Sequence, residues 1–244
     1  MSNAKSVTIM NLLQVIGMIL IVKGLIYGQS LDSRLLQKAS FVPKSTSALD
    51  QLIEVAHHYE IPMGIEWIDR PDAKVLTLPQ SKRTSVQRLI TAILRQSPGY
   101  RLKVADGVVH IANKTFVGDP RNFLNLRISE FRVKEGNVFD ADASLRLGIT
   151  MTLHPERYAR GWNGGYGYGA GGVFDVPNIT FFGRNLIVRQ ILNKIIAANG
   201  NALWVVQLNP SRMMNAEPSF FAQEYESQDF RWQFIPLQKS RDNK

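Results

Sequence analysis

Hydrophobic positions recur at helical spacing in two neighbouring stretches of the chain. Between residues 84 and 96 they form a continuous stripe made of Val86, Leu89, Ile90, Ile93 and Leu94. A stripe of this kind predicts an amphipathic helix that packs one face against a core. Residues 45–56 show the same spacing after hydroxyl residues that suit a helix N-cap. We therefore expect a helix in each stretch.

Short apolar or alternating runs predict the strands around these helices. The clearest pair is 100–104 and 108–112, because the Asp106-Gly107 step between them is a strong indicator of a hairpin turn. Further strands are predicted over residues 64–68, 75–78, 123–131 and 229–235. A third helix is predicted over residues 137–153.

A second copy of the strand–helix–strand pattern follows later in the chain. Residues 77–104 align without a gap over residues 179–206, and the apolar stripe is kept. The simplest interpretation is one module used twice. The alternative is that any two strand–helix–strand units share this spacing.

The predicted fold class is α+β, with two tandem small modules in which one or two helices cover a two- to three-stranded sheet. The modules span residues 45–114 and 123–208, the second carries an insertion at 157–172, and a tail covers 209–244. The expected core residues are Val86, Leu89, Ile93, Val188, Ile191 and Ile195.

The first 28 residues have the pattern of a targeting segment. Lys5 precedes an apolar run over residues 7–22, and a small residue, Gly28, follows it. This pattern predicts a signal peptide or, if it is retained, a membrane anchor. Both alternatives place the rest of the chain outside the cytoplasm, in the periplasm or exported, with membrane contact only through this segment.

Two arginines share one face of the helix predicted over residues 84–96. The 244 residues carry a formal net charge of +9. Arg88 and Arg95 lie seven residues apart, so they share a helix face opposite the apolar stripe. This face is either simply solvated or a docking face for an acidic partner, anionic lipid headgroups or cell-wall polymers.

Residues that could carry catalysis are scarce. The absence of cysteine excludes thiolate metal sites and thiol nucleophiles. His57 and His58 are adjacent and point apart on a helix, although Glu54 makes a surface metal site with His58 conceivable. Ser144 has acidic neighbours but no histidine close in sequence. We expect no catalytic residue, cofactor or metal and predict a non-enzymatic protein, with an unrecognised hydrolase as an alternative.

The inserted loop at residues 157–172 combines many glycines with Trp162, Tyr166 and Tyr168. It is either a flexible insertion, a protein-docking loop, or a surface on which sugar rings stack. Nucleic acid is not an expected partner, because an exported protein rarely meets it.

Residues 46–114 resemble the short N-terminal domain of secretins and TonB-dependent receptors. The resemblance lies in the runs LDQLIEVAHHYEIPMGIEW, VLTLPQSKRTSVQRLITAIL and GYRLKVADGVVHIAN. Residues 124–208 look like a diverged relative of the same domain. The whole chain is also similar to exported bacterial proteins that join two such modules. The resemblance implies a domain that docks proteins in the cell envelope and has no fixed catalytic residue.

The resulting hypothesis is a periplasmic interaction module that docks a protein of an envelope assembly, of the secretin or TonB type. We expect a partner strand to add to an exposed edge of the 108–112 hairpin, at Val109 and Ile111. The alternative is a cell-wall or glycan-binding module that uses the Gly- and Tyr-rich loop.

Overall fold

The computed structural model describes residues 30–68, 84–120, 122–153, 155–156, 177–208 and 230–237. The predicted targeting segment, the strand at 75–78, the loop at 157–172 and most of the tail lie outside these residues. The helical elements are α2 (Leu31–Leu36), α3 (Ala48–His58), α4 (Val86–Arg95), η1 (Phe123–Asn125), α5 (Val138–Leu153) and α7 (Val188–Asn199). The strands are β1 (Met63–Ile68), β2 (Tyr100–Ala105), β3 (Val108–Asn113), β4 (Arg127–Gly136), β5 (Ile179–Ile187), β6 (Ala202–Leu208) and β7 (Phe230–Pro236).

The elements confirm an α+β fold, but their strands are arranged in sheets differently from the prediction. A single mixed sheet has the order β2-β3-β1-β6-β7. Its central strand β1 runs parallel to both β3 and β6, and all six residues of β1 are in register with β6. Both segments therefore contribute strands to one five-stranded sheet, whereas the sequence pattern predicts a separate sheet in each module. The strands β4 and β5 form a second, two-stranded sheet.

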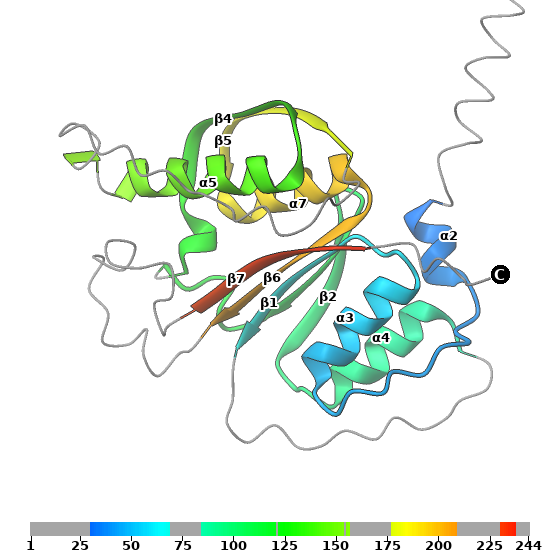
Figure 1. The fold of residues 1–244 in the computed structure, drawn as a ribbon. Helices are drawn as coiled ribbons and strands as arrows, with labels where there is room; N and C mark the ends of the chain where they lie inside the picture. Colours follow the sequence, from blue (N-terminus) through cyan, green and yellow to red (C-terminus); the bar gives the residue numbers. More distant parts are fainter. Residues whose placement is uncertain are drawn as a thin grey trace, which may run out of the picture.

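Helices cover both faces of this sheet, which gives three layers (Figure 1). The helices α3 and α4 pack on one face, whereas α5 and α7 pack on the other. The antiparallel strand pair β4–β5, which α5 separates in the chain, lies over α5 and α7 on the side away from this sheet. The two similar helices α4 and α7 thus lie on opposite faces of one sheet.

The central strands bury both of their faces, as expected for strands between two helical layers. Met63 and Ile65 point to the α3–α4 core, while Glu66 on the other face lies at the α7 side. The indole of Trp204 lies directly over Gly64, where an added Cβ would come within 2.5 Å of the ring. The glycine is therefore required by the close approach of that ring.

The local predictions hold at most elements. All six predicted core residues are buried, each with at most 9% of its surface exposed. The hairpin turn at Asp106 and Gly107 has positive φ angles of 55° and 77°. The start of α4 differs by one residue, because Ser85 rather than Thr84 is the N-cap and accepts a hydrogen bond from the Arg88 N–H.

A buried ion pair joins the sheet to α7. Glu66, 1% exposed, accepts hydrogen bonds from Arg189 through Nε and, at 3.0 Å, through Nη2. Its carboxylate also lies 2.8 Å from His110 Nε2 and 3.2 Å from Asn122 Nδ2. Arg189 Nη1 donates to Asn125 Oδ1 at 2.7 Å. Both charges are therefore fully engaged inside the protein.

The environment of Glu66 keeps it ionised. Burial alone opposes the charged carboxylate, but the hydrogen bonds from His110 and Arg189, together with the positive charge of Arg189, outweigh it and lower the pKa of Glu66. The interaction therefore stabilises the fold at neutral pH and weakens only as pH falls through this lowered pKa.

Removing the Glu66 carboxylate should destabilise the protein strongly. We expect Glu66→Ala to lower the free energy of unfolding by about 3–5 kcal/mol, because the Arg189 charge stays buried without its partner. The matched control is Glu130→Ala, since Glu130 makes only exposed ion pairs with Arg132 and Arg184 and should cost less than about 1 kcal/mol. Urea unfolding measures both, and equal losses would contradict the central role of Glu66.

Candidate functional site

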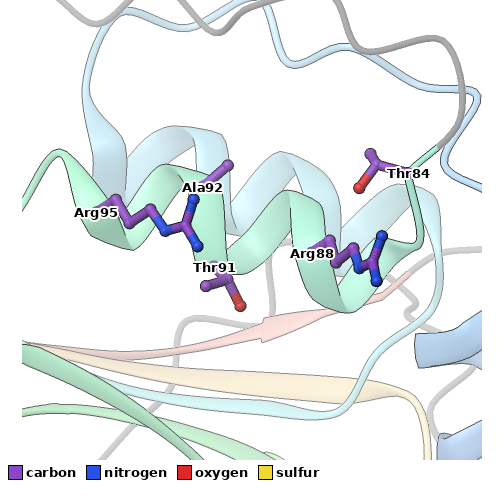
Figure 2. Close-up of a pocket in the computed structure, with 5 residues that line it drawn as sticks. All are labelled: Thr84, Arg88, Thr91, Ala92 and Arg95. Carbon is purple, nitrogen blue, oxygen red and sulfur yellow. The ribbon is translucent and has the colours of Figure 1, made fainter.

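The exposed face of α4 carries a shallow hollow. The residues that line it are Thr84, Arg88, Thr91, Ala92 and Arg95 (Figure 2). The opposite face of α4 is fixed by burial of the apolar stripe, so the hollow lies on a helix held rigidly against the sheet. The sequence-predicted pair Arg88 and Arg95 is confirmed as an exposed pair on one face.

The two guanidinium groups lie along the helix with Thr91 between them (Figure 2). Seven residues of α-helix place their Cα atoms about 10 Å apart along the axis. Among the residues that the structure describes, no carboxylate lies within ion-pair distance of Arg88 or Arg95. The Thr91 hydroxyl donates to the Gln87 carbonyl oxygen at 2.8 Å. The hollow therefore presents two exposed cations that no carboxylate of the described residues pairs.

The predicted partner-binding edge at Val109 and Ile111 is wrong. Both residues are 0% exposed, and β3 is flanked by β2 on one side and β1 on the other. Hairpin patterning identified β3 correctly, but the parallel pairing with β1 takes up the edge that appeared free in sequence. Among the described strands, β2 forms the edge on this side of the sheet instead.

The three aromatic residues of the glycine-rich loop are not placed. Trp162, Tyr166 and Tyr168 lie outside the described residues. The role of these three aromatic residues in docking or sugar binding remains a prediction.

The side chains of Glu54 and His58, which the sequence suggests as metal ligands, contact other groups of the protein. The Glu54 carboxylate accepts hydrogen bonds from the backbone N–H groups of Lys44 at 2.7 Å and Ser45 at 3.1 Å. Burial opposes its ionisation, but these bonds and the Ser45 hydroxyl lower the pKa of Glu54. The His58 ring stacks on Phe41 with 4.4 Å between centroids. In the described part of the chain, no group of three or more histidines and acids is arranged to hold a metal.

Sequence reasoning missed two buried charged clusters, the one around Glu66 and Arg189 and a second one that joins α5 to β7. Asp142 Oδ2 accepts a hydrogen bond from Arg146 Nε at 2.9 Å. The Arg146 guanidinium lies 4.1 Å from the centre of the Trp232 ring and donates to the Trp232 carbonyl oxygen. Asp142 Oδ1 is buried and accepts no hydrogen bond from any residue that the structure describes. The spacing of four residues between Asp142 and Arg146 was the available indication in sequence.

Burial dominates the ionisation of Asp142. It raises the pKa of Asp142 to about 6, although the charge and hydrogen bond of Arg146 act in the opposite direction. The carboxyl is therefore partly protonated under mildly acidic conditions.

Comparison with known proteins adds no relative. The chain matches no protein-family model, no curated protein and no solved structure. Within the described residues, no helix is both long enough and apolar enough to cross a membrane. Function is therefore inferred from the residues and their geometry.

The raised pKa of Asp142 makes stability depend on pH in a defined direction. The folded state holds the Asp142 proton more tightly than the unfolded chain does, so this contribution is complete below about pH 4 and is lost as pH rises through about 6. Asparagine cannot titrate, so Asp142→Asn lacks this loss. We therefore expect the free energy of unfolding of Asp142→Asn, relative to that of the natural chain, to rise by up to about 3 kcal/mol as pH increases from 4 to 7.

Urea unfolding at a series of pH values measures this difference. The control is Asp106→Asn, which changes an exposed carboxylate in the hairpin turn and suits the positive φ of that position. A constant difference between Asp142→Asn and the natural chain across the range would show that burial does not control this carboxyl.

Proposed function

We propose that this chain is a non-catalytic interaction module of the bacterial cell envelope, and that the exposed face of α4 binds an acidic segment of a protein partner. The observation that carries the proposal is the pair Arg88 and Arg95, which line one hollow on α4 and form no ion pair with any described residue. Guanidinium groups bind carboxylates with two parallel hydrogen bonds, so each arginine favours an aspartate or glutamate of the partner.

The spacing of the arginines indicates the form of the ligand. Two helical turns separate them by about 10 Å, and one turn of polyproline II chain, three residues at about 3.1 Å each, covers a similar length and returns the side chain to the same face. A partner segment in the polyproline II conformation with carboxylates at positions i and i+3 therefore matches the pair. Thr91 and Ala92 form a small, uncharged surface between the two cations that leaves room for the backbone of such a segment.

A protein segment fits this hollow better than a lipid surface. Lipid-binding patches gather about four to eight lysines and arginines, whereas the hollow has two. The net charge of +9 adds a general attraction for acidic partners.

The cellular setting of the proposal comes from the sequence. The targeting pattern of residues 1–28 and the resemblance to the secretin and TonB receptor domain support a periplasmic or exported protein that docks an assembly of that type. The glycan-binding alternative depends on Trp162, Tyr166 and Tyr168, and no described residue supports it.

A peptide titration tests the α4 face. The probe is a fluorescent, proline-rich peptide of polyproline II conformation with two glutamates three residues apart, and its dissociation constant is measured by anisotropy at low salt. We expect the double variant Arg88→Ala/Arg95→Ala to weaken binding about tenfold, because about 1.4 kcal/mol of exposed charge pairing is lost.

The control removes the same charge elsewhere. Arg132→Ala/Arg184→Ala deletes two exposed arginines of the β4–β5 strand pair and should leave the dissociation constant unchanged. A peptide with one glutamate should bind the natural chain more weakly than the two-glutamate probe. If both double variants weaken binding equally, general charge rather than the α4 face attracts the peptide, and the proposal fails.

A further inference from the structure

The outer edge of β2 is free of any described strand. β2 is the terminal strand of the sheet and pairs only with β3 among the described elements. A terminal strand leaves every second residue with a backbone N–H and C=O that point away from the sheet. These groups are the requirement for adding a further strand.

The hairpin geometry identifies which residues face outward. The turn over Asp106 and Gly107 has positive φ at both positions, as in a type I′ turn, so Ala105 and Val108 form a hydrogen-bonded pair. The Lys114 N–H donates to the carbonyl oxygen of residue 99 at 2.8 Å, so residues 99 and 114 also form a hydrogen-bonded pair. This pair lies an even number of residues from the pair of Ala105 and Val108, as the alternation of an antiparallel ladder requires. Alternation then directs the backbone groups of Arg101 and Lys103 toward β3.

The residues between these positions present the free edge. The N–H and C=O groups of Leu102 and Val104 point away from β3, because their neighbours form the hydrogen-bonded pairs. Val104 is also 41% exposed, which is unusual for a valine beside a core. Leu102 next to it packs against the α3–α4 core. The edge therefore combines free backbone groups with a small apolar surface.

The side chains on the other face of β2 are basic. Arg101 and Lys103 are exposed, and within the described structure neither lies in an ion pair. They are two residues apart, so they project from the same face of the strand. A neighbouring strand with acidic residues at alternate positions would place them opposite these cations, where cross-strand charge pairs are favourable.

We propose that the edge of β2 binds an extended protein segment of alternating acidic and apolar residues as an additional strand of the sheet. The backbone of the segment pairs with Leu102 and Val104, its acidic side chains face Arg101 and Lys103, and its apolar side chains contact Val104. A second copy of this chain fits poorly, because two β2 strands would bring like charges together. This surface is separate from the α4 hollow and uses none of its residues.

Hydrogen exchange measured by NMR tests the proposal directly. The probe is a synthetic peptide that alternates glutamate and valine, and the comparison peptide alternates lysine and valine. The amides of Arg101 and Lys103 are already bonded to β3 and should exchange at the same rate with or without peptide. The amides of Leu102 and Val104 should exchange at least tenfold more slowly with the glutamate peptide and should not respond to the lysine peptide.

Two variants separate strand addition from simple charge attraction. Val104→Pro removes an outward N–H without removing a bond to β3, and proline is tolerated at such edge positions. It should weaken peptide binding at least tenfold, whereas the control Val104→Thr should not. In Arg101→Glu/Lys103→Glu, the lysine peptide rather than the glutamate peptide should bind more tightly. This second test does not require the protein to accommodate a proline.

The outcomes distinguish this proposal from the one for α4. Arg88→Ala/Arg95→Ala should leave the protection of Leu102 and Val104 unchanged. Absence of protection with the glutamate peptide would overturn the proposal and assign Arg101 and Lys103 to protecting the edge against aggregation. Protection that persists in Arg101→Glu/Lys103→Glu would overturn the acidic character of the ligand.

Discussion

The buried contact between Glu66 and Arg189 is the interaction on which the architecture depends. Burying two charges is costly unless each is hydrogen-bonded on all sides, and here His110, Asn122 and Asn125 complete the set. The two charged residues come from β1 and α7, and their three partners come from β3 and from the segment that follows β3. Because the pair requires these partners, it holds the first half of the chain against the second and defines how α7 lies on the sheet.

The common sheet also decides where partners can bind. Because β1 lies between β3 and β6, the central strands have no free edge and no exposed face. The two surfaces that we propose for recognition therefore lie at the periphery, on the outer face of α4 and along β2. Both are parts of elements whose opposite sides are packed in the core, so neither has to become ordered before it binds.

The arginines of this protein fall into two groups with different roles. Arg189 and Arg146 are largely buried, and each contacts a buried carboxylate. Arg88, Arg95 and Arg101 are exposed and have no carboxylate within ion-pair distance among the described residues. The first group stabilises the fold, whereas we propose that the second supplies charge for partners. The apolar stripe of α4 predicts that Arg88 and Arg95 are exposed, but the carboxylate that Arg189 meets in β1 lies far away in the chain and is not indicated by any local pattern.

The sequence by itself determined the local elements. The apolar stripe of α4, the hairpin turn at Asp106 and Gly107 and the core position of Ile191 follow from periodicity and turn chemistry, which act between near neighbours. Tertiary structure alone decided that β1 pairs with β6, that Val109 and Ile111 are buried, and that Glu66 meets Arg189. Such contacts join residues far apart in the chain, and their energy depends on the alignment of whole elements rather than on any local pattern.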